Sequence, residues 1–120
     1  MKIAVAASSN DQGSQMDQRF GRAKYFAIFD DEKQNYEYAS NSQNLSLPQG
    51  AGIQAAKNVI ESGAQALIAR NVGPKAFDLL RSSGVEMYVC ESEIPVCEAI
   101  ELFKKGGLVK LDGANAEGHW

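Results

Sequence analysis

Two kinds of residue in this chain suit the binding of a negatively charged ligand: glycines that leave backbone N–H groups uncovered, and several arginine and lysine side chains. The glycines lie in the segment Leu47-Pro48-Gln49-Gly50-Ala51-Gly52-Ile53, which runs from a loop into an expected helix. Uncovered N–H groups and the positive end of a helix dipole favour an anion at such a position. No Lys-Ser/Thr pair follows, which excludes a P-loop. A glycine-rich helix start that binds only water is the alternative interpretation.

Catalysis has little support in the sequence. Residues 2–7, the expected first strand, contain no acidic residue, so the carboxylate–metal site of a nuclease is not expected. Cys97 is expected in the core, on the apolar face of a helix. The candidate metal ligands are Met16, Cys90 and the single histidine, His119. Each has a structural alternative: Met16 covers apolar surface, Cys90 is a partly buried small residue, and His119 belongs to an inert tail. We therefore expect no enzymatic activity.

The length and charge of the chain limit its organisation and its partners. A length of 120 residues indicates one α/β domain, predicted over residues 1–107, followed by a C-terminal tail at residues 108–120. The net charge of −3 gives no overall attraction to nucleic acid or to anionic membranes, so an anionic ligand needs a local group of cations. The sequence shows no signal peptide, membrane span, disulfide framework or CxxC site. A cytoplasmic monomer is expected.

Hydrophobic patterning predicts the element order β-β-β-α-β-α-β-α. The expected strands are residues 2–7, 23–30, 35–40, 66–69 and 85–89, and the expected helices begin near residues 50, 74 and 95. The first strand is apolar on both faces and therefore central, whereas the third alternates and lies at an edge. This predicts an α/β fold: a ribonuclease-H-like three-layer sandwich with three helices and a five-stranded mixed sheet of order 3-2-1-4-5, in which strand 2 is antiparallel. The first two helices are expected on one face and the third on the other.

Ligands favour the carboxyl ends of parallel strands, and this topology brings four loops to that edge of the sheet. The loops are residues 8–22, 41–52, 70–74 and 90–94. Five cations are expected around one shallow basin there: Arg19, Arg22, Lys24, Arg70 and Lys75. The carboxylates of the same loops are expected to point away or to remain at the rim; they are Asp11, Asp17, Glu91 and Glu93. The alternative is that the cations are scattered and solvated.

Three motifs resemble the dinitrogenase iron–molybdenum cofactor biosynthesis family. They are Phe20-Gly21-Arg22-Ala23-Lys24-Tyr25-Phe26, Gly50-Ala51-Gly52-Ile53-Gln54-Ala55-Ala56 and Asn71-Val72-Gly73-Pro74-Lys75-Ala76-Phe77. The resemblance extends from the first strand to the last helix and is closest to the small stand-alone members of sulfate reducers, which are anaerobes. It implies non-enzymatic binding, storage or carriage of an anionic metal–sulfur cluster. This is iron–molybdenum cofactor in the nitrogen-fixation branch and a molybdenum–copper sulfide in the stand-alone branch.

The residue at position 19 affects the expected mode of binding. Many members of the nitrogenase branch have His-Phe-Gly where this chain has Arg19-Phe20-Gly21, and that histidine is a candidate cluster ligand. A cation there favours ion pairing and N–H···S hydrogen bonds over direct coordination. It also favours a molybdenum–copper sulfide cluster, or a related molybdenum/iron–sulfur cluster. The expected cluster-binding residues are Arg19, Gly21, Arg22, Lys24, Gln49, Gly50, Ala51, Gly52, Asn71, Gly73 and Lys75.

Two functions of different classes follow from these residues. The first is a carrier of a molybdenum–sulfur cluster, with a partner ATPase or a cofactor-delivery protein. The second is a regulatory or interaction protein whose glycine loops bind phosphate or nucleotide; a hydrolase is a weak third interpretation. Visible absorption distinguishes the first two, because sulfide-to-metal charge transfer gives colour whereas a nucleotide absorbs only in the ultraviolet.

Overall fold

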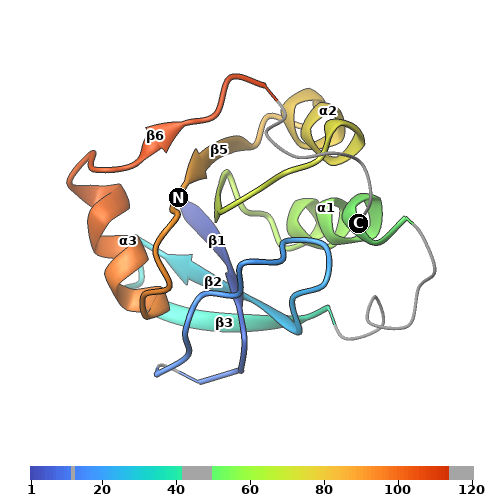
Figure 1. Ribbon diagram of the computed structural model, residues 1–120. Helices are drawn as coiled ribbons and strands as arrows, with labels where there is room; N and C mark the ends of the chain where they lie inside the picture. Colours follow the sequence, from blue (N-terminus) through green and yellow to red (C-terminus); the bar gives the residue numbers. More distant parts are fainter. Residues whose placement is uncertain (12, 42–49, 114–120) are drawn as a thin grey trace.

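The computed structural model describes residues 1–11, 13–41 and 50–113. Within these ranges the chain forms a mixed sheet with helices on both faces (Figure 1). The strands are β1 (Lys2–Ala7), β2 (Tyr25–Asp30), β3 (Asn35–Ser40), β4 (Ala66–Ala69), β5 (Glu86–Val89) and β6 (Val109–Lys110). The helices are α1 (Ala51–Glu61), α2 (Pro74–Ser82) and α3 (Val96–Lys104).

The described strands confirm the predicted order and extend it. The sheet order is β3-β2-β1-β4-β5-β6. β1 pairs antiparallel with β2 and parallel with β4, and β4 pairs parallel with β5. The prediction of five strands was wrong, because Val109 and Lys110, which were assigned to the tail, pair antiparallel with Val89 and Tyr88 as β6. Two residues are too few to show the alternation that marks a strand in a sequence. The likeness to ribonuclease-H-like folds remains a prediction.

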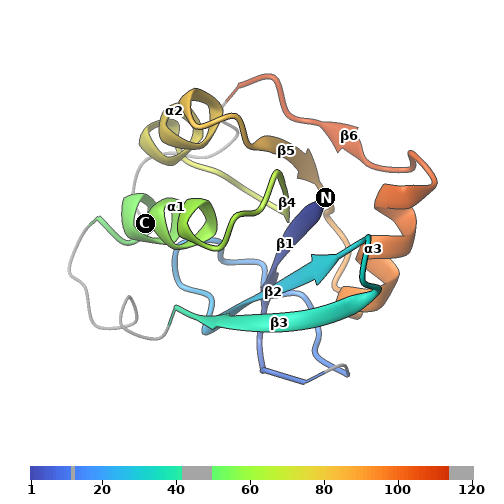
Figure 2. The ribbon, with the colours of Figure 1, turned by 180° about the vertical axis from the view of Figure 1, so that it is seen from behind.

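The central strand β1 contributes to two hydrophobic cores, because successive side chains of a strand point to opposite faces of the sheet. Ala4 and Ala6 belong to the core beneath α1 and α2. Ile3, Val5 and Ala7 belong to the core beneath α3. Figures 1 and 2 show α1 and α2 on one side of the sheet and α3 on the other, which agrees with the prediction.

Helix α3 buries a different stripe from the one predicted. Its buried residues are Val96, Ala99 and Ile100, which share one face because their spacing follows the helical repeat. Cys97 is displaced from Val96 by about 100° around the helix, and its side chain is exposed. The prediction of a core position for Cys97 was therefore wrong.

The two thiols should differ in reactivity. We expect iodoacetamide to modify Cys97 rapidly in the folded protein and Cys90 only as the molecule opens, because Cys90 is 5% exposed. Mass analysis of peptides from partly labelled protein measures the two rates, and a Cys97→Ser control should lack the fast phase. Equal modification rates for the two thiols would contradict this expectation.

Candidate functional site

The structure places the described parts of the predicted loops at one edge of the sheet. β1, β4 and β5 are parallel, so their carboxyl ends lie at the same edge. Tyr25, the first residue of β2, pairs there with Ala7 of β1 and with Ser40 of β3. α1 and α2 each lead to the start of the next parallel strand, so both helices begin at this edge and run back from it.

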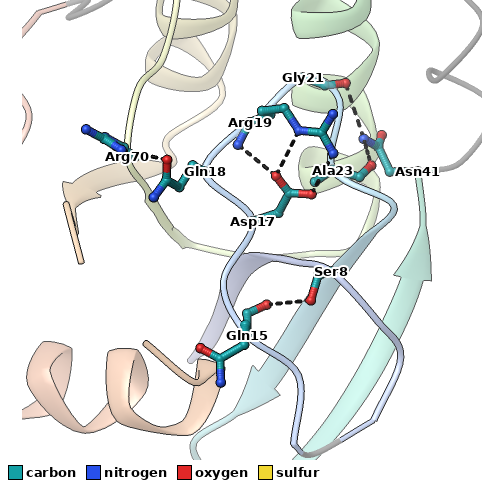
Figure 3. A network of polar contacts seen from close by, with 9 residues as sticks. All are labelled: Ser8, Gln15, Asp17, Gln18, Arg19, Gly21, Ala23, Asn41 and Arg70. Atoms are coloured by element: carbon teal, nitrogen blue, oxygen red, sulfur yellow. Dashed lines mark hydrogen bonds and ion pairs between the residues drawn. The ribbon is translucent and has the colours of Figure 1, made fainter. Parts of the chain in front are cut away.

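The loop after β1 is fixed between that strand and the residues that precede α3. The Met16 N–H donates to the Ile94 carbonyl over 3.0 Å, and the Asp17 N–H donates to the Ala6 carbonyl over 2.9 Å. Isolated β-bridges join the same segment to the last residue of β1 and to the residue before α3. The loop therefore acts as a short additional strand, and it presents Arg19 at the sheet edge (Figure 3).

Arg19 forms an ion pair with Asp17 within this loop. Its backbone N–H donates to Asp17 Oδ1 over 2.9 Å and its Nε to the same oxygen over 3.3 Å, while its Nη2 donates to Oδ2 over 3.3 Å (Figure 3). The expectation that Asp17 points away or remains at the rim was wrong. A carboxylate two residues before an arginine accepts both the backbone N–H of the turn and the guanidinium.

The same loop contacts the end of β4 and borders a hollow. Arg70 Nη1 donates to Gln18 Oε1 over 2.6 Å, which joins the ends of β1 and β4 (Figure 3). Beside this contact lies a hollow of about 460 Å³, lined by Ser8, Gln15, Met16, Asp17, Gln18, Arg19 and Glu93. Its lining combines acidic, amide and hydroxyl groups with one arginine, so the hollow itself is not the positive basin predicted from the sequence.

A buried asparagine fixes the segment that precedes β2. Asn41 is 0% exposed, and its Nδ2 donates to the carbonyl oxygens of Ala23, over 2.7 Å, and Gly21, over 3.4 Å (Figure 3). Its Oδ1 accepts from Asn58 Nδ2 of α1 over 2.6 Å. Asn41 thus joins the end of β3, the first family motif and α1. Sequence reasoning missed it, because an asparagine after a strand reads as an ordinary turn residue.

The first turns of α1 and α2 hold the other two motifs. Gly50 precedes α1 with φ 80° and Gly73 precedes α2 with φ −72°, and neither helix has a side-chain capping hydrogen bond. The backbone angle explains why Gly50 is a glycine; a Cβ there would meet nothing within 4 Å. Ala51, Gly52 and Gly73 are buried.

The predicted cations differ in exposure. Lys24 and Lys75 are exposed, whereas Arg22 is half-buried. Asn71 is half-buried and Gly21 is buried. These residues belong to segments that meet at the same sheet edge, and Gln49 lies outside the described residues.

The candidate metal ligands are mostly inaccessible. Met16 and Cys90 are each 5% exposed and belong to the core beneath α3. The Cys90 Sγ donates to the Ser92 carbonyl over 3.8 Å. His119 lies outside the described residues. Within residues 1–11, 13–41 and 50–113, no group of three or more His, Cys, Asp or Glu side chains is arranged to hold a metal ion.

Shifted pKa values occur away from the predicted site: the backbone N–H of Lys33 lowers the pKa of Asp30, at the far end of β2. Burial raises the pKa of Tyr36 and of Tyr38, which lie on β3. The hydrogen bond from Lys110 to Glu86 raises the pKa of that lysine. These groups therefore keep their ordinary charge at neutral pH.

Comparison with known proteins identifies the family. Residues 1–106 match the family described as Dinitrogenase iron-molybdenum cofactor. The chain belongs to this family. The family resemblance predicted from the three motifs is thereby confirmed.

Relatives of this family member cover nearly its whole length. The apo form of the orange protein from Desulfovibrio gigas is 35% identical, with a TM-score of 0.91 and 96% of each chain covered. A NifB-like protein from Thermotoga is 34% identical, with a TM-score of 0.83 and 98% of each chain covered. An uncharacterised protein from Methanocaldococcus jannaschii is 30% identical over 93% of this chain and 92% of its own. No helix in the described part of the chain is long and apolar enough to cross a membrane.

Proposed function

We propose that this protein binds and carries an anionic metal–sulfur cluster. The observation that supports this most is the meeting of three family motifs at one edge of the sheet, in a chain that matches the family over residues 1–106. We propose a molybdenum–copper sulfide or a related molybdenum/iron–sulfur cluster as the cargo. The proposed carrier is a cytoplasmic monomer without enzymatic activity. It exchanges cargo with a delivery protein or a partner ATPase, and it has no nucleic-acid or membrane partner.

The residues at this edge suit a cluster held by charge and by hydrogen bonds. The residues that precede α1 and α2 are glycines without a side-chain cap, so N–H groups in the first turns of these helices would donate to sulfide. Lys24 and Lys75 are exposed in segments that reach the same sheet edge and would neutralise the cluster's charge together with Arg22. The burial of the Met16 and Cys90 side chains supports ion pairing in preference to direct ligation.

The same N–H groups suit a phosphate, so a nucleotide-binding regulator is the second candidate. Glycines at the start of two adjacent helices favour it as much as they favour a sulfide anion. The two candidates differ in which ligand, metal–sulfur cluster or nucleotide, binds in stoichiometric amounts. A titration measures this stoichiometry.

The test is a titration of the apo protein with tetrathiomolybdate and copper(I), followed by visible absorption. We expect saturable binding that weakens as salt rises, since exposed charges are screened over about 10 Å at roughly 0.1 M. ATP and inorganic phosphate added at equal concentrations should not displace the coloured complex. Absence of saturable uptake, with stoichiometric binding of ATP, would reject the carrier in favour of the nucleotide-binding regulator.

A further inference from the structure

We propose that Asp17 is an internal competitor for Arg19. Its carboxylate occupies the Nε and Nη2 edge of the guanidinium in the ligand-free protein, and a bound anion takes that edge of Arg19 only by displacing Asp17. This inference rests on the proposed function, because the anion concerned is the proposed cargo. The consequence is weaker binding and faster release than the cations of the site would otherwise give, which suits a protein that must hand its cargo on.

The two partners of the ion pair differ in freedom. The Asp17 side chain is 9% exposed and the Arg19 side chain is 63% exposed. The backbone of Asp17 is fixed by its N–H bond to the Ala6 carbonyl, whereas the arginine has a long stem that reaches solvent. The carboxylate is therefore the fixed partner. The guanidinium is the partner that can turn to an arriving anion.

The competition between Asp17 and an arriving anion follows from the bonds that the Asp17 carboxylate accepts from Arg19. Arg19 Nε and Nη2 bond to the two oxygens of Asp17 in a forked arrangement, which is the geometry that a guanidinium also offers to other anions. An anion at this edge must replace both bonds and lies beside the carboxylate it has displaced, and an anion at the other edge still meets the negative charge of Asp17. An exposed ion pair of this kind changes an equilibrium by about two- to fivefold.

The chain offers a substitution that separates the charge of Asp17 from its role in the turn. Asp17 Oδ1 accepts the Arg19 backbone N–H over 2.9 Å, and the amide oxygen of asparagine can keep that bond. Asp11 provides a matched control in the same loop, since its Oδ1 accepts the Gly13 N–H over 2.9 Å. Asp11→Asn thus removes an equal charge and also preserves a turn.

The first measurement needs no ligand. Phenylglyoxal modifies accessible arginines, and the rate at Arg19 is compared with the rate at exposed Arg81 in the same molecule. We expect Asp17→Asn to raise the ratio about threefold and Asp11→Asn to leave it unchanged. An unchanged ratio in Asp17→Asn would show that the carboxylate does not hold Arg19, and it would overturn the inference whether or not a cluster binds.

The second measurement is the affinity for tetrathiomolybdate at low salt. We expect Asp17→Asn to bind about fivefold more tightly than the parent, mainly through slower dissociation. In the Arg19→Gln background the same change should have only the small effect of Asp11→Asn. Equal affinities of the parent and Asp17→Asn would overturn this inference and leave the proposed function standing. Lack of binding by the parent would reject the proposed function, and the inference with it.

Discussion

Replacing Arg22, Lys24 and Lys75 together by glutamine is expected to weaken binding of tetrathiomolybdate by about 100-fold. Each cation at a partly desolvated site contributes about 1 kcal/mol to the binding of an anion, and about 3 kcal/mol corresponds to a factor of this size. Arg19 is left out of the set because Asp17 already neutralises it. Titration at low salt, followed by visible absorption, measures the loss.

A matched triple variant separates the position of the cations from their number. Lys33, Arg81 and Lys105 are exposed and lie in turns or at helix ends on the opposite edge of the sheet. Their replacement by glutamine makes the same change in net charge and should weaken binding less than threefold, because screening limits the effect of distant charges. Equal losses in the two triple variants would show that net charge, not a local basin, attracts the anion.

Asn41→Ala is expected to lower the free energy of unfolding by about 3 kcal/mol. The substitution leaves the carbonyl oxygens of Gly21 and Ala23 and the amide of Asn58 without the hydrogen bonds that the Asn41 side chain makes to them, and Asn41 is 0% exposed. Each buried polar group that loses its hydrogen bond costs about 1–3 kcal/mol, and relaxation of the neighbours keeps the total near the lower end. Urea unfolding measures the change through the transition midpoint.

Two further variants test the cause of that loss. Asn35 is exposed at the start of β3, the strand that Asn41 follows. Asn35→Ala should change stability by less than about 0.5 kcal/mol. Asn58→Ala removes the bond that Asn58 Nδ2 donates to Asn41 Oδ1 and should cost about 1 kcal/mol. A loss below about 1 kcal/mol for Asn41→Ala would show that the side-chain hydrogen bonds of Asn41 contribute little to joining the three segments.

The fold was predictable where a pattern extends over several residues. β1 is a run of apolar residues long enough to indicate burial on both faces, and connection rules then fix the order of the parallel strands. β6 was not predictable, because Val109 and Lys110 have no periodicity of their own and depend on pairing with β5. Cys97 was misplaced because an apolar residue type was given more weight than its angular position on α3.

The place of the loops around the candidate site was predictable from the sequence, but the pairing of their side chains was not. The topology correctly brought the loop that carries Arg19 to the carboxyl edge of β1. The neutralisation of Arg19 by Asp17 depends on a turn conformation that the two-residue spacing permits but does not require. Asn41 could not be identified, because its partners are 17 to 20 residues away along the chain and local sequence gives no indication of them.

The double pairing of the loop after β1 has a consequence for the thermodynamics of binding. The amides of Met16 and Asp17 are hydrogen-bonded to Ile94 and Ala6, so the backbone that carries Arg19 becomes ordered when the chain folds. Its conformational entropy is lost at that stage and not when a ligand arrives. An anion that binds here then restricts little more than the rotamers of one long side chain, which costs about 0.5–1.5 kcal/mol. Binding at this loop should therefore have a small heat-capacity change and no component of coupled folding.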